Sequence, residues 1–458
     1  MHRAILGAVL AAAAASSTPL VVAPETFHLG RFGTVALYRP AEAVKGVVIL
    51  MSGDQGWTPQ AASLAHRLTS LGAAVAGVRT PAYLRAWGRS RNTCINPNVD
   101  MVALAQDVEH RLGLRSYVEP ILVGEASGAS LTYATVAQAP DGLYRGAVSL
   151  DFAPDLAGTK PWCRENGFAA SPSAKGWIFA PVRHVGAPWF ILQGSQTQRS
   201  STPIQGFAAQ VGGAQVISLH DGTRGEPQVE AAVRPLLEPP AAPRPASLVL
   251  PDNLPLTSVP SPPDRAGGLM AIFYSGDGGW AGLDRSVSGR LAAAGIPVVG
   301  LDSLKYFWTA RSPAESARDL ARIIDGYGAA WHRPRVLLVG YSFGAGALPA
   351  TVAALPPAIR DRVAQISLMG LPERGELEFH LSDWLNIGDA SAGATAPVVD
   401  RLGTILHIQC LRGAQEQDSG CPAVSNGRVQ QIVLPGGHHF AGNDAAIAAA
   451  ILRGLRLA

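Results

Sequence analysis

Short runs of consecutive apolar residues recur along the chain and are separated by stretches with helical character. In the first half, an apolar run at 47–51 is followed by a helical stretch at 61–71 and by another apolar run at 73–78. The same order returns in the second half, from residue 270 to residue 301. Runs that are apolar from end to end are typical of strands buried on both faces of a sheet. Strands that alternate with helices predict the α/β class, with mostly parallel sheets.

Two motifs occur twice at a nearly constant separation, which indicates a duplication. Ser52 begins the sequence SGDQGW, and Ser275 begins SGDGGW 223 residues later. Ala126 and Ser342 occupy the same place in two further matching segments, at a separation of 216 residues. The difference indicates a net insertion in the first copy, near residues 90–99. The chain is therefore predicted to contain two tandem copies of one α/β domain.

A proline-rich segment separates the two copies. Proline fixes φ and has no amide donor, so residues 238–247 are predicted to form a stiff, extended linker. This places the first domain at 24–237 and the second at 248–458. Within the latter, 248–259 is expected to open the domain as an edge strand or hairpin.

The N-terminus is predicted to be a cleaved signal peptide over residues 1–17. His2 and Arg3 precede a short apolar run, and small residues follow it. Export to an oxidising compartment favours disulfides among the four cysteines. The simplest pairing stays within each copy, and it joins Cys94 to Cys163 and Cys410 to Cys421.

Composition and charge narrow the class of protein. Apolar residues make up 47% of the chain and charged residues 16%, which is typical of globular domains with large cores rather than of disorder. The formal net charge is only +3 and no basic run is present, so nucleic acid is not expected as a partner.

The second copy contains the sequence of a nucleophile elbow. Residues 340–344 read GYSFG, in which Ser342 would be the nucleophile. A G-x-S-x-G motif is weak evidence in a glycine-rich chain. Here an apolar strand at 335–339 precedes it and a helix of small residues at 345–354 follows, which makes the signal strong.

The partners of the serine should follow it in the order acid, then histidine. A strand predicted at 404–410 leads into a loop with two candidate acids, Glu416 and Asp418. A later strand leads into a glycine turn with His438 and His439. We prefer His439 as the base because it directly precedes an aromatic residue. The spacing of the histidines does not fit a metal site, so neither a metal nor another cofactor is expected.

An oxyanion hole and a substrate-binding rim are expected near the serine. The backbone N–H of Phe343 should be one oxyanion donor, and that of Asp277 or Gly278 the other. The segment that follows the next strand should border the same site, because ligands bind at the carboxyl ends of strands. Its candidate substrate-binding residues are Asp302, Lys305, Tyr306 and Trp308.

The first copy lacks the corresponding chemistry. Ala126 stands in place of the nucleophile, and the loop at 194–198 contains no carboxylate. The loop at 219–223 has no GGHH sequence. Loss at all three places indicates a retired active site that is kept as a scaffold or binding domain. The chain is therefore predicted to contain two tandem α/β-hydrolase-like domains with mostly parallel sheets, of which the N-terminal one is degenerate.

Four motifs of the second copy carry a resemblance to a known family. They are SGDGGW at 275–280, SLKYFW at 303–308, GYSFG at 340–344 and PGGHHF at 435–440. Together they resemble the VirJ/AcvB family of bacterial virulence proteins, and the two-copy arrangement resembles its AcvB-like members. The resemblance implies a periplasmic α/β-hydrolase that cleaves the aminoacyl ester of aminoacyl-phosphatidylglycerol, lysyl-phosphatidylglycerol in particular.

The implied partners are an aminoacyl-phospholipid at the membrane surface and, for some members, components or substrates of type IV secretion. The ammonium groups of such a substrate would need carboxylates, for which Asp277 and Asp302 are candidates. Two other interpretations remain at this stage: a general esterase or thioesterase, and a non-catalytic periplasmic adaptor.

Overall fold

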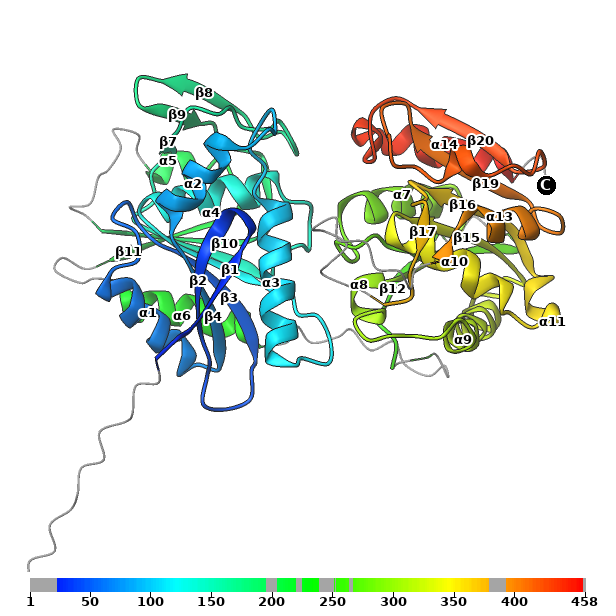
Figure 1. The fold of residues 1–458 in the computed structure, drawn as a ribbon, viewed down its shortest axis with the longest axis horizontal. Coiled ribbons are helices and arrows are strands. Elements are labelled where there is room, and N and C mark those ends of the chain that lie inside the picture. The colour runs from blue at the N-terminus through cyan, green and yellow to red at the C-terminus, as the bar shows by residue number, and fades with distance from the viewer. Residues whose placement is uncertain are drawn as a thin grey trace, which may run out of the picture.

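Two β-sheets, each covered by helices, lie beside each other in the protein (Figure 1). The computed structural model describes residues 23–194, 204–219, 225–238, 251, 253–262, 267–378 and 393–455. The predicted signal peptide at 1–17 lies outside these residues, as does the predicted linker except for Glu238. The predicted domain limits stay predictions, but each sheet falls entirely within one copy of the duplication.

The first sheet has eight strands in the order β1-β2-β4-β3-β5-β6-β10-β11. From β4 to β11 all neighbours are parallel, and β1 and β2 are added antiparallel at one edge. A separate three-stranded antiparallel sheet has the order β7-β9-β8. The strands are β1 Glu25–Leu29, β2 Gly33–Tyr38, β3 Gly46–Met51, β4 Ala73–Val78, β5 Ile121–Glu125, β6 Gly146–Leu150, β7 Asp155–Ala157, β8 Ala170–Ser173, β9 Gly176–Phe179, β10 His184–Gly194 and β11 Gly212–Leu219.

Helices cover both faces of this sheet. One face is covered by α2, α3 and α4, and the other by α1 and α6. The helices are η1 Gly30–Phe32, α1 Pro59–Thr69, α2 Thr80–Arg89, α3 Asn98–Leu112, α4 Ser127–Gln138, α5 Ile204–Ala208, α6 Glu226–Val233 and η2 Arg234–Leu237.

The second sheet has seven strands in the order β12-β14-β13-β15-β16-β19-β20. All neighbours are parallel except the edge strand β12, which pairs antiparallel with β14. The strands are β12 Leu256–Val259, β13 Leu269–Tyr274, β14 Val298–Leu301, β15 Arg335–Tyr341, β16 Val363–Met369, β19 Ile408–Gly413 and β20 Gln430–Leu434, with β17 Arg374–Gly375 and β18 Gly393–Ala394 in a small separate pair. The helices are α7 Gly282–Ala293, α8 Ser303–Tyr306, α9 Pro313–Trp331, α10 Phe343–Ala353, α11 Pro357–Arg360, α13 Ala396–Leu402, η3 Cys421–Ala423, η4 Phe440–Gly442 and α14 Asp444–Gly454.

The strand orders confirm the predicted fold class and its duplication. Six parallel strands of the second sheet, β14-β13-β15-β16-β19-β20, repeat the connectivity of β4-β3-β5-β6-β10-β11 in the first. The strand predicted at 404–410 is shifted, because β19 begins only at Ile408 and continues to Gly413. Glu416 therefore follows the end of this strand by three residues.

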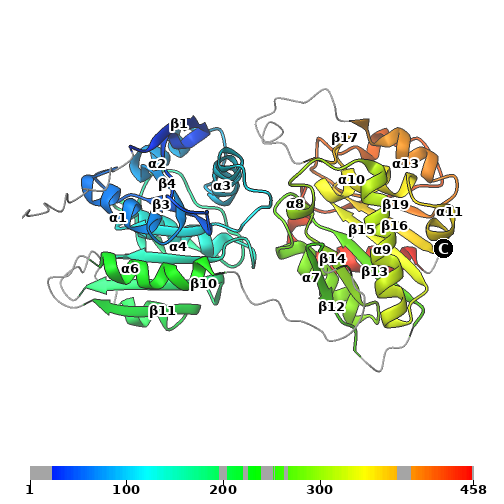
Figure 2. The same cartoon turned by 90° about the horizontal axis from the view of Figure 1, so that it is seen from below.

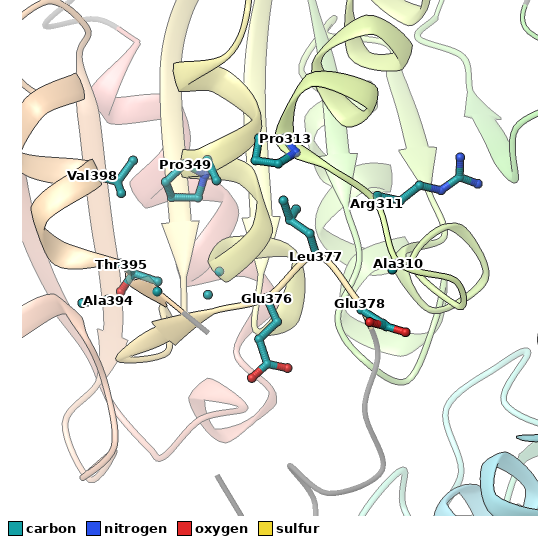
Figure 3. A pocket seen from close by; sticks show the side chains of 14 residues that line it. Ala310, Arg311, Pro313, Pro349, Glu376, Leu377, Glu378, Ala394, Thr395 and Val398 are labelled. Atoms are coloured by element: carbon teal, nitrogen blue, oxygen red, sulfur yellow. The ribbon is translucent and has the colours of Figure 1, made fainter. Parts of the chain in front are cut away.

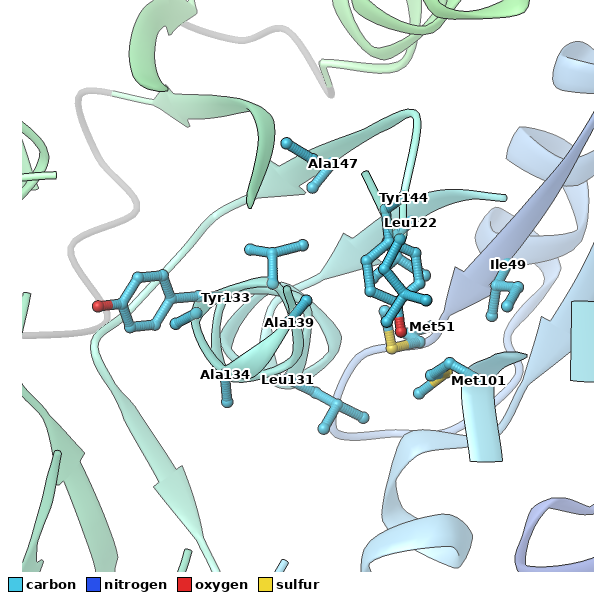
Figure 4. Packing of buried hydrophobic residues seen from close by; sticks show 14 of the residues in the cluster. Ile49, Met51, Met101, Leu122, Leu131, Tyr133, Ala134, Ala139, Tyr144 and Ala147 are labelled. Atoms are coloured by element: carbon cyan, nitrogen blue, oxygen red, sulfur yellow. The ribbon is translucent and has the colours of Figure 1, made fainter. Parts of the chain in front are cut away.

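The end-to-end apolar strands are buried because side chains on both faces enter a core. Alternate residues of β3 separate in this way: Ile49 and Met51 join the cluster under α3 and α4, while Val48 and Leu50 join the cluster under α1 and α6. Figure 4 shows part of the first of these clusters, where Met51 lies near Leu122. Tyr274 and Phe273 of β13 likewise belong to different clusters of the second sheet.

The segment around α8 joins the two halves of the protein. Figure 2 shows α8 on the side of the second half that faces α3 of the first. The ring of Trp308 stacks on His110 with centroids 4.1 Å apart, and its indole N–H donates to the carbonyl of Leu114 at 2.7 Å. The ammonium of Lys305 lies 2.5 Å from a carboxylate oxygen of Glu119.

The predicted disulfides are both confirmed. Cys94 pairs with Cys163, and Cys410 pairs with Cys421. Along the described segments, no helix has the length and apolar character needed to cross a lipid bilayer.

Candidate active site

Ser342 lies at a sharp turn between β15 and α10, as its motif predicts. Its φ of 51° and ψ of −116° are rare for a residue with a side chain, and such strain is typical of a nucleophile elbow. Glycine is needed on both sides: a Cβ on Gly340 would lie 2.7 Å from the carbonyl oxygen of Gly344, and one on Gly344 would overlap the carbonyl oxygen of Tyr274. The turn therefore holds the serine at the carboxyl end of the sheet.

His438, and not His439, contacts the serine. Its Nε2 lies 2.8 Å from the hydroxyl oxygen of Ser342, and its Nδ1 lies 2.6 Å from a carboxylate oxygen of Glu416. His439 instead places its Nδ1 2.6 Å from the hydroxyl of Tyr341. The preference for His439 is therefore wrong, because adjacent side chains of this turn point in different directions and only one reaches the elbow.

Glu416 is the acid that the structure brings to the histidine. Its side chain is only 2% exposed, and its second oxygen accepts the backbone N–H of Gly413 at 3.0 Å. Asp418 is exposed and forms no hydrogen bond within the described residues. The disulfide between Cys410 and Cys421 closes the loop that carries both acids.

Sequence reasoning missed a glycine that makes room for this contact. Gly370 follows β16 with a φ of +59°. A Cβ at this position would lie 2.8 Å from a ring carbon of His438 and 3.4 Å from the Glu416 carboxylate. Its only signal in the sequence is a glycine directly after an apolar strand, which many loops share.

The electrostatic surroundings of His438 favour its protonated form. Burial lowers the pKa of His438, but the hydrogen bond and charge of Glu416 outweigh burial, and the charges of Asp277 and Asp418 add to them. Its pKa therefore lies above the ordinary value of 6.5. These carboxylates stabilise the imidazolium that forms when His438 accepts a proton from serine.

The loop at 275–280 lies beside the serine, where an oxyanion hole is expected. A Cβ on Gly276 would lie 3.6 Å from the Cβ of Ser342. Asp277 and Gly278 follow in the same loop and are half-buried. A hydrogen bond from α8 holds the start of this loop: the hydroxyl of Ser275 accepts the backbone N–H of Ser303 at 2.8 Å.

Asp284 is a second residue that sequence reasoning missed. It is 4% exposed on α7, and one of its carboxylate oxygens accepts the backbone N–H of Ala281, which directly follows the loop at 275–280, at 3.5 Å. Burial raises the pKa of Asp284 well above its usual range. An aspartate near the start of a helix is commonly a cap, so its position in the sequence did not indicate that it is buried beside the end of this loop.

The predicted substrate-binding residues serve other contacts. Tyr306 is 2% exposed and donates its hydroxyl to Asp319 at 2.8 Å, while Trp308 is 3% exposed and docks on the first half. The prediction is therefore wrong for these two side chains, which packing withdraws from the site. Asp302 accepts the backbone N–H of Lys305 at 3.1 Å and lies 3.5 Å from its ammonium. Both line a small cavity between the halves, together with Gly278 and Gly279.

A larger cavity lies beside α10. It has a volume of about 360 Å³ and extends from Gly346, one helical turn after Ser342, to Val398 of α13. Glu376 and Glu378 lie at its edge (Figure 3). This cavity provides space next to the helix that follows the nucleophile.

The first half keeps the elbow without the nucleophile. Ala126 has a φ of 53° and a ψ of −113°, nearly the values of Ser342. A Cβ on Gly124 or Gly128 would overlap backbone atoms, as in the second half. The loops at 195–203 and 220–224, which contain most of the expected acid and base positions of this copy, lie outside the described residues.

Fold and site together define a class of protein. A parallel sheet, an elbow between strand and helix, and hydrogen-bonded Ser342, Glu416 and His438 in this chain order are those of an α/β-hydrolase. Residues 268–458 match the family model described as bacterial virulence protein (VirJ). Residues 268–458 are therefore similar to the VirJ family, as the resemblance predicted.

Solved structures with a similar fold cover a little under half of the chain. An esterase from Thermogutta terrifontis is 15% identical, with 44% of this chain and 93% of that chain covered and a TM-score of 0.34. Est1E from Butyrivibrio proteoclasticus is 12% identical, with 45% and 96% covered and a TM-score of 0.32. XC6422 from Xanthomonas campestris, a serine hydrolase, is 16% identical, with 44% and 87% covered and a TM-score of 0.31. No curated protein matches the chain.

Proposed function

We propose that this protein is a periplasmic serine hydrolase that cleaves the aminoacyl ester of aminoacyl-phosphatidylglycerol, with lysyl-phosphatidylglycerol as a substrate. The observation that carries the catalytic part is the hydrogen-bonded chain from Ser342 through His438 to Glu416. The substrate class is what the resemblance to the VirJ/AcvB family implies, and the family match over 268–458 supports that resemblance. The two disulfides fit an exported protein. A link to type IV secretion stays a prediction from the resemblance.

The reaction would proceed through an acyl-enzyme. The hydroxyl oxygen of Ser342 attacks the ester carbonyl carbon while Nε2 of His438 takes its proton. The carbon–oxygen bond to the glycerol headgroup then breaks, and His438 returns the proton to the leaving oxygen. Water, deprotonated by the same histidine, attacks the acyl-enzyme and releases the amino acid. Glu416 holds the ring orientation and stabilises the imidazolium throughout.

The negative oxygen of each tetrahedral intermediate needs hydrogen-bond donors. The backbone N–H of Phe343, at the first position of α10, is one donor in this proposal. The loop at 276–278 supplies the second, and its closeness to Ser342 supports the assignment. Asp284 contacts the end of this loop through the N–H of Ala281.

Asp277 is the carboxylate that we assign to the substrate ammonium. Asp302, the other candidate, already lies beside Lys305 and caps α8. Asp277 is half-buried, and its charge contributes to the raised pKa of His438, which indicates that it lies near the reacting groups. A carboxylate at this position would favour an ester with an α-ammonium over a simple acyl ester.

The first test removes the nucleophile. In cells that lack the gene, aminoacyl-phosphatidylglycerol should accumulate, and a Ser342→Ala protein should fail to lower it. The purified variant should lose kcat on the order of 10⁶-fold, because no other group of the site replaces the nucleophile. Extracted lipids and released amino acid are the measurements.

The matched variant is Ala126→Ser, which gives the first half a serine on the same elbow. Introduced into the Ser342→Ala protein, it should restore no hydrolysis, since the first copy lacks the acid and base sequences. If aminoacyl lipid does not accumulate in the absence of the gene, the proposed substrate is wrong.

The second test examines recognition of the ammonium. Asp277→Asn should lower kcat/KM for lysyl or alanyl esters by at least about tenfold and leave acetyl esters nearly unchanged. Asp418→Asn is the control, since this carboxylate also acts on His438 but lies outside the loop at 275–280. Equal losses on aminoacyl and acetyl esters would contradict a role in ammonium recognition.

A further inference from the structure

The first half contains a cavity at the place of its lost active site. The cavity has a volume of about 530 Å³, within the range of small-molecule sites. Ser127, directly after Ala126, forms part of its wall, and so does Asp54 of the SGDQGW loop. The opening therefore occupies the position at which the second half holds Ser342 and the loop at 275–280.

The walls of this cavity are built from parts that distinguish the first half from the second. Ile95 comes from the net insertion near 90–99, and Leu156 comes from β7 of the extra three-stranded sheet. Ile95 and the neighbourhood of Trp162 are tied by backbone hydrogen bonds and by the adjacent Cys94–Cys163 disulfide. Ile95, Leu156 and Trp162 are each at most 6% exposed, so the floor is apolar and well packed.

Positive charge surrounds one side of the opening. Arg85 and Arg89 lie four residues apart on α2, are exposed, and form no ion pair with any residue that the structure describes. Lys160 adds a third cation, whose ammonium is held by the carbonyl oxygens of Ser90 and Asn92, each at 2.7 Å. Asp54 is the single carboxylate among the residues that line the cavity.

The wall of the cavity includes a buried hydroxyl without a described partner. Ser127 is only 7% exposed, and within the described ranges its hydroxyl oxygen has no hydrogen-bond partner. It is the first residue of α4, a helix of twelve residues whose N-terminus carries partial positive charge. Buried hydroxyls normally have partners, so this one requires an explanation.

We propose that this cavity binds an anionic amphiphile: a phosphate or carboxylate group at Ser127 and the α4 N-terminus, flanked by Arg85 and Arg89, with an apolar chain over Ile95, Leu156 and Trp162. The arginine charges favour an anionic head group, and the apolar floor favours an apolar tail on the same ligand. The retained elbow directs donors at the ligand but supplies no nucleophile, so the ligand is bound and not cleaved. The first half is thereby a lipid-binding domain in its own right, whatever ester the second half hydrolyses.

The test uses the full chain and octyl phosphate, with inorganic phosphate and 1-octanol as comparison ligands, by titration calorimetry. Octyl phosphate should bind once per chain, and each comparison ligand at least about tenfold more weakly. Arg85→Gln combined with Arg89→Gln should weaken octyl phosphate by about tenfold or more. Arg290→Gln combined with Arg401→Gln removes the same charge from exposed positions outside the cavity and should change the affinity by less than about twofold.

A second variant separates binding from folding. Ser127→Ala removes a buried hydroxyl that has no partner, so it should leave thermal stability unchanged or higher while weakening octyl phosphate. If inorganic phosphate binds as tightly as octyl phosphate, the proposal that the ligand needs an apolar chain is wrong. Equal weakening in the control pair, or loss of binding after covalent modification of Ser342, would also overturn the proposed site.

Discussion

His438 and His439 are neighbours in the chain, yet only His438 shares a hydrogen bond with Ser342. The distinction between them depends on which side chain the turn directs at the elbow and on the space left by Gly370. Glu416 differs from Asp418 in the same way, because burial and the N–H of Gly413 fix one carboxylate while the other stays exposed. At this scale, position rather than residue type decides the role.

The raised pKa of His438 predicts the pH dependence of hydrolysis. The histidine acts as a base only when it is neutral, so kcat/KM should fall as the pH drops through a pKa above 6.5. Glu416→Gln removes the largest effect that raises this pKa, so the acid limb should move to lower pH, and kcat should fall by up to about 10⁴-fold. Histidine titration by NMR and pH–rate profiles measure both effects.

Asp418→Asn serves as the control for that prediction. It removes one of the weaker charges that act on His438 but leaves the hydrogen bond to Glu416 in place. Its acid limb should shift less than that of Glu416→Gln. A wild-type acid limb below 6.5 would contradict the electrostatics described for the site.

The two elbows, β5 to α4 and β15 to α10, show that a backbone conformation can be kept after its catalytic residue is lost. Their backbone angles nearly coincide because glycines on both sides are enclosed by backbone atoms in each copy. The strain that is typical of a nucleophile is thus retained at Ala126, where no nucleophile exists. An elbow alone is therefore evidence of fold, and the loops after later strands are evidence of catalysis.

At the scale of the whole molecule, α8 connects the arrangement of the halves to the site. Trp308 is buried against His110, while Ser303 in the same segment holds Ser275 of the loop beside the serine. Two of the residues expected to bind substrate, Trp308 and Lys305, therefore contact the first half instead.

Trp308→Ala should loosen this contact. Loss of a buried tryptophan costs about 3–5 kcal/mol, so the unfolding midpoint should fall by several degrees and small-angle scattering should show a more extended chain. Trp331→Ala is the comparison, since Trp331 packs on Tyr327 within the second half. An unchanged scattering profile for Trp308→Ala would contradict a structural role for this residue in holding the halves together.

The sequence by itself determined the α/β class, the duplication, both disulfides and the positions of the nucleophile elbows. These features depend on local periodicity, on glycine where no Cβ fits, and on the number of cysteines, all of which can be read directly from the sequence. Only the tertiary structure decided between His438 and His439, selected Glu416, buried Asp284 against the N–H of Ala281, and moved Tyr306 and Trp308 from the site to packing contacts. Those outcomes depend on side-chain direction and burial between segments far apart in sequence, and no local pattern encodes them.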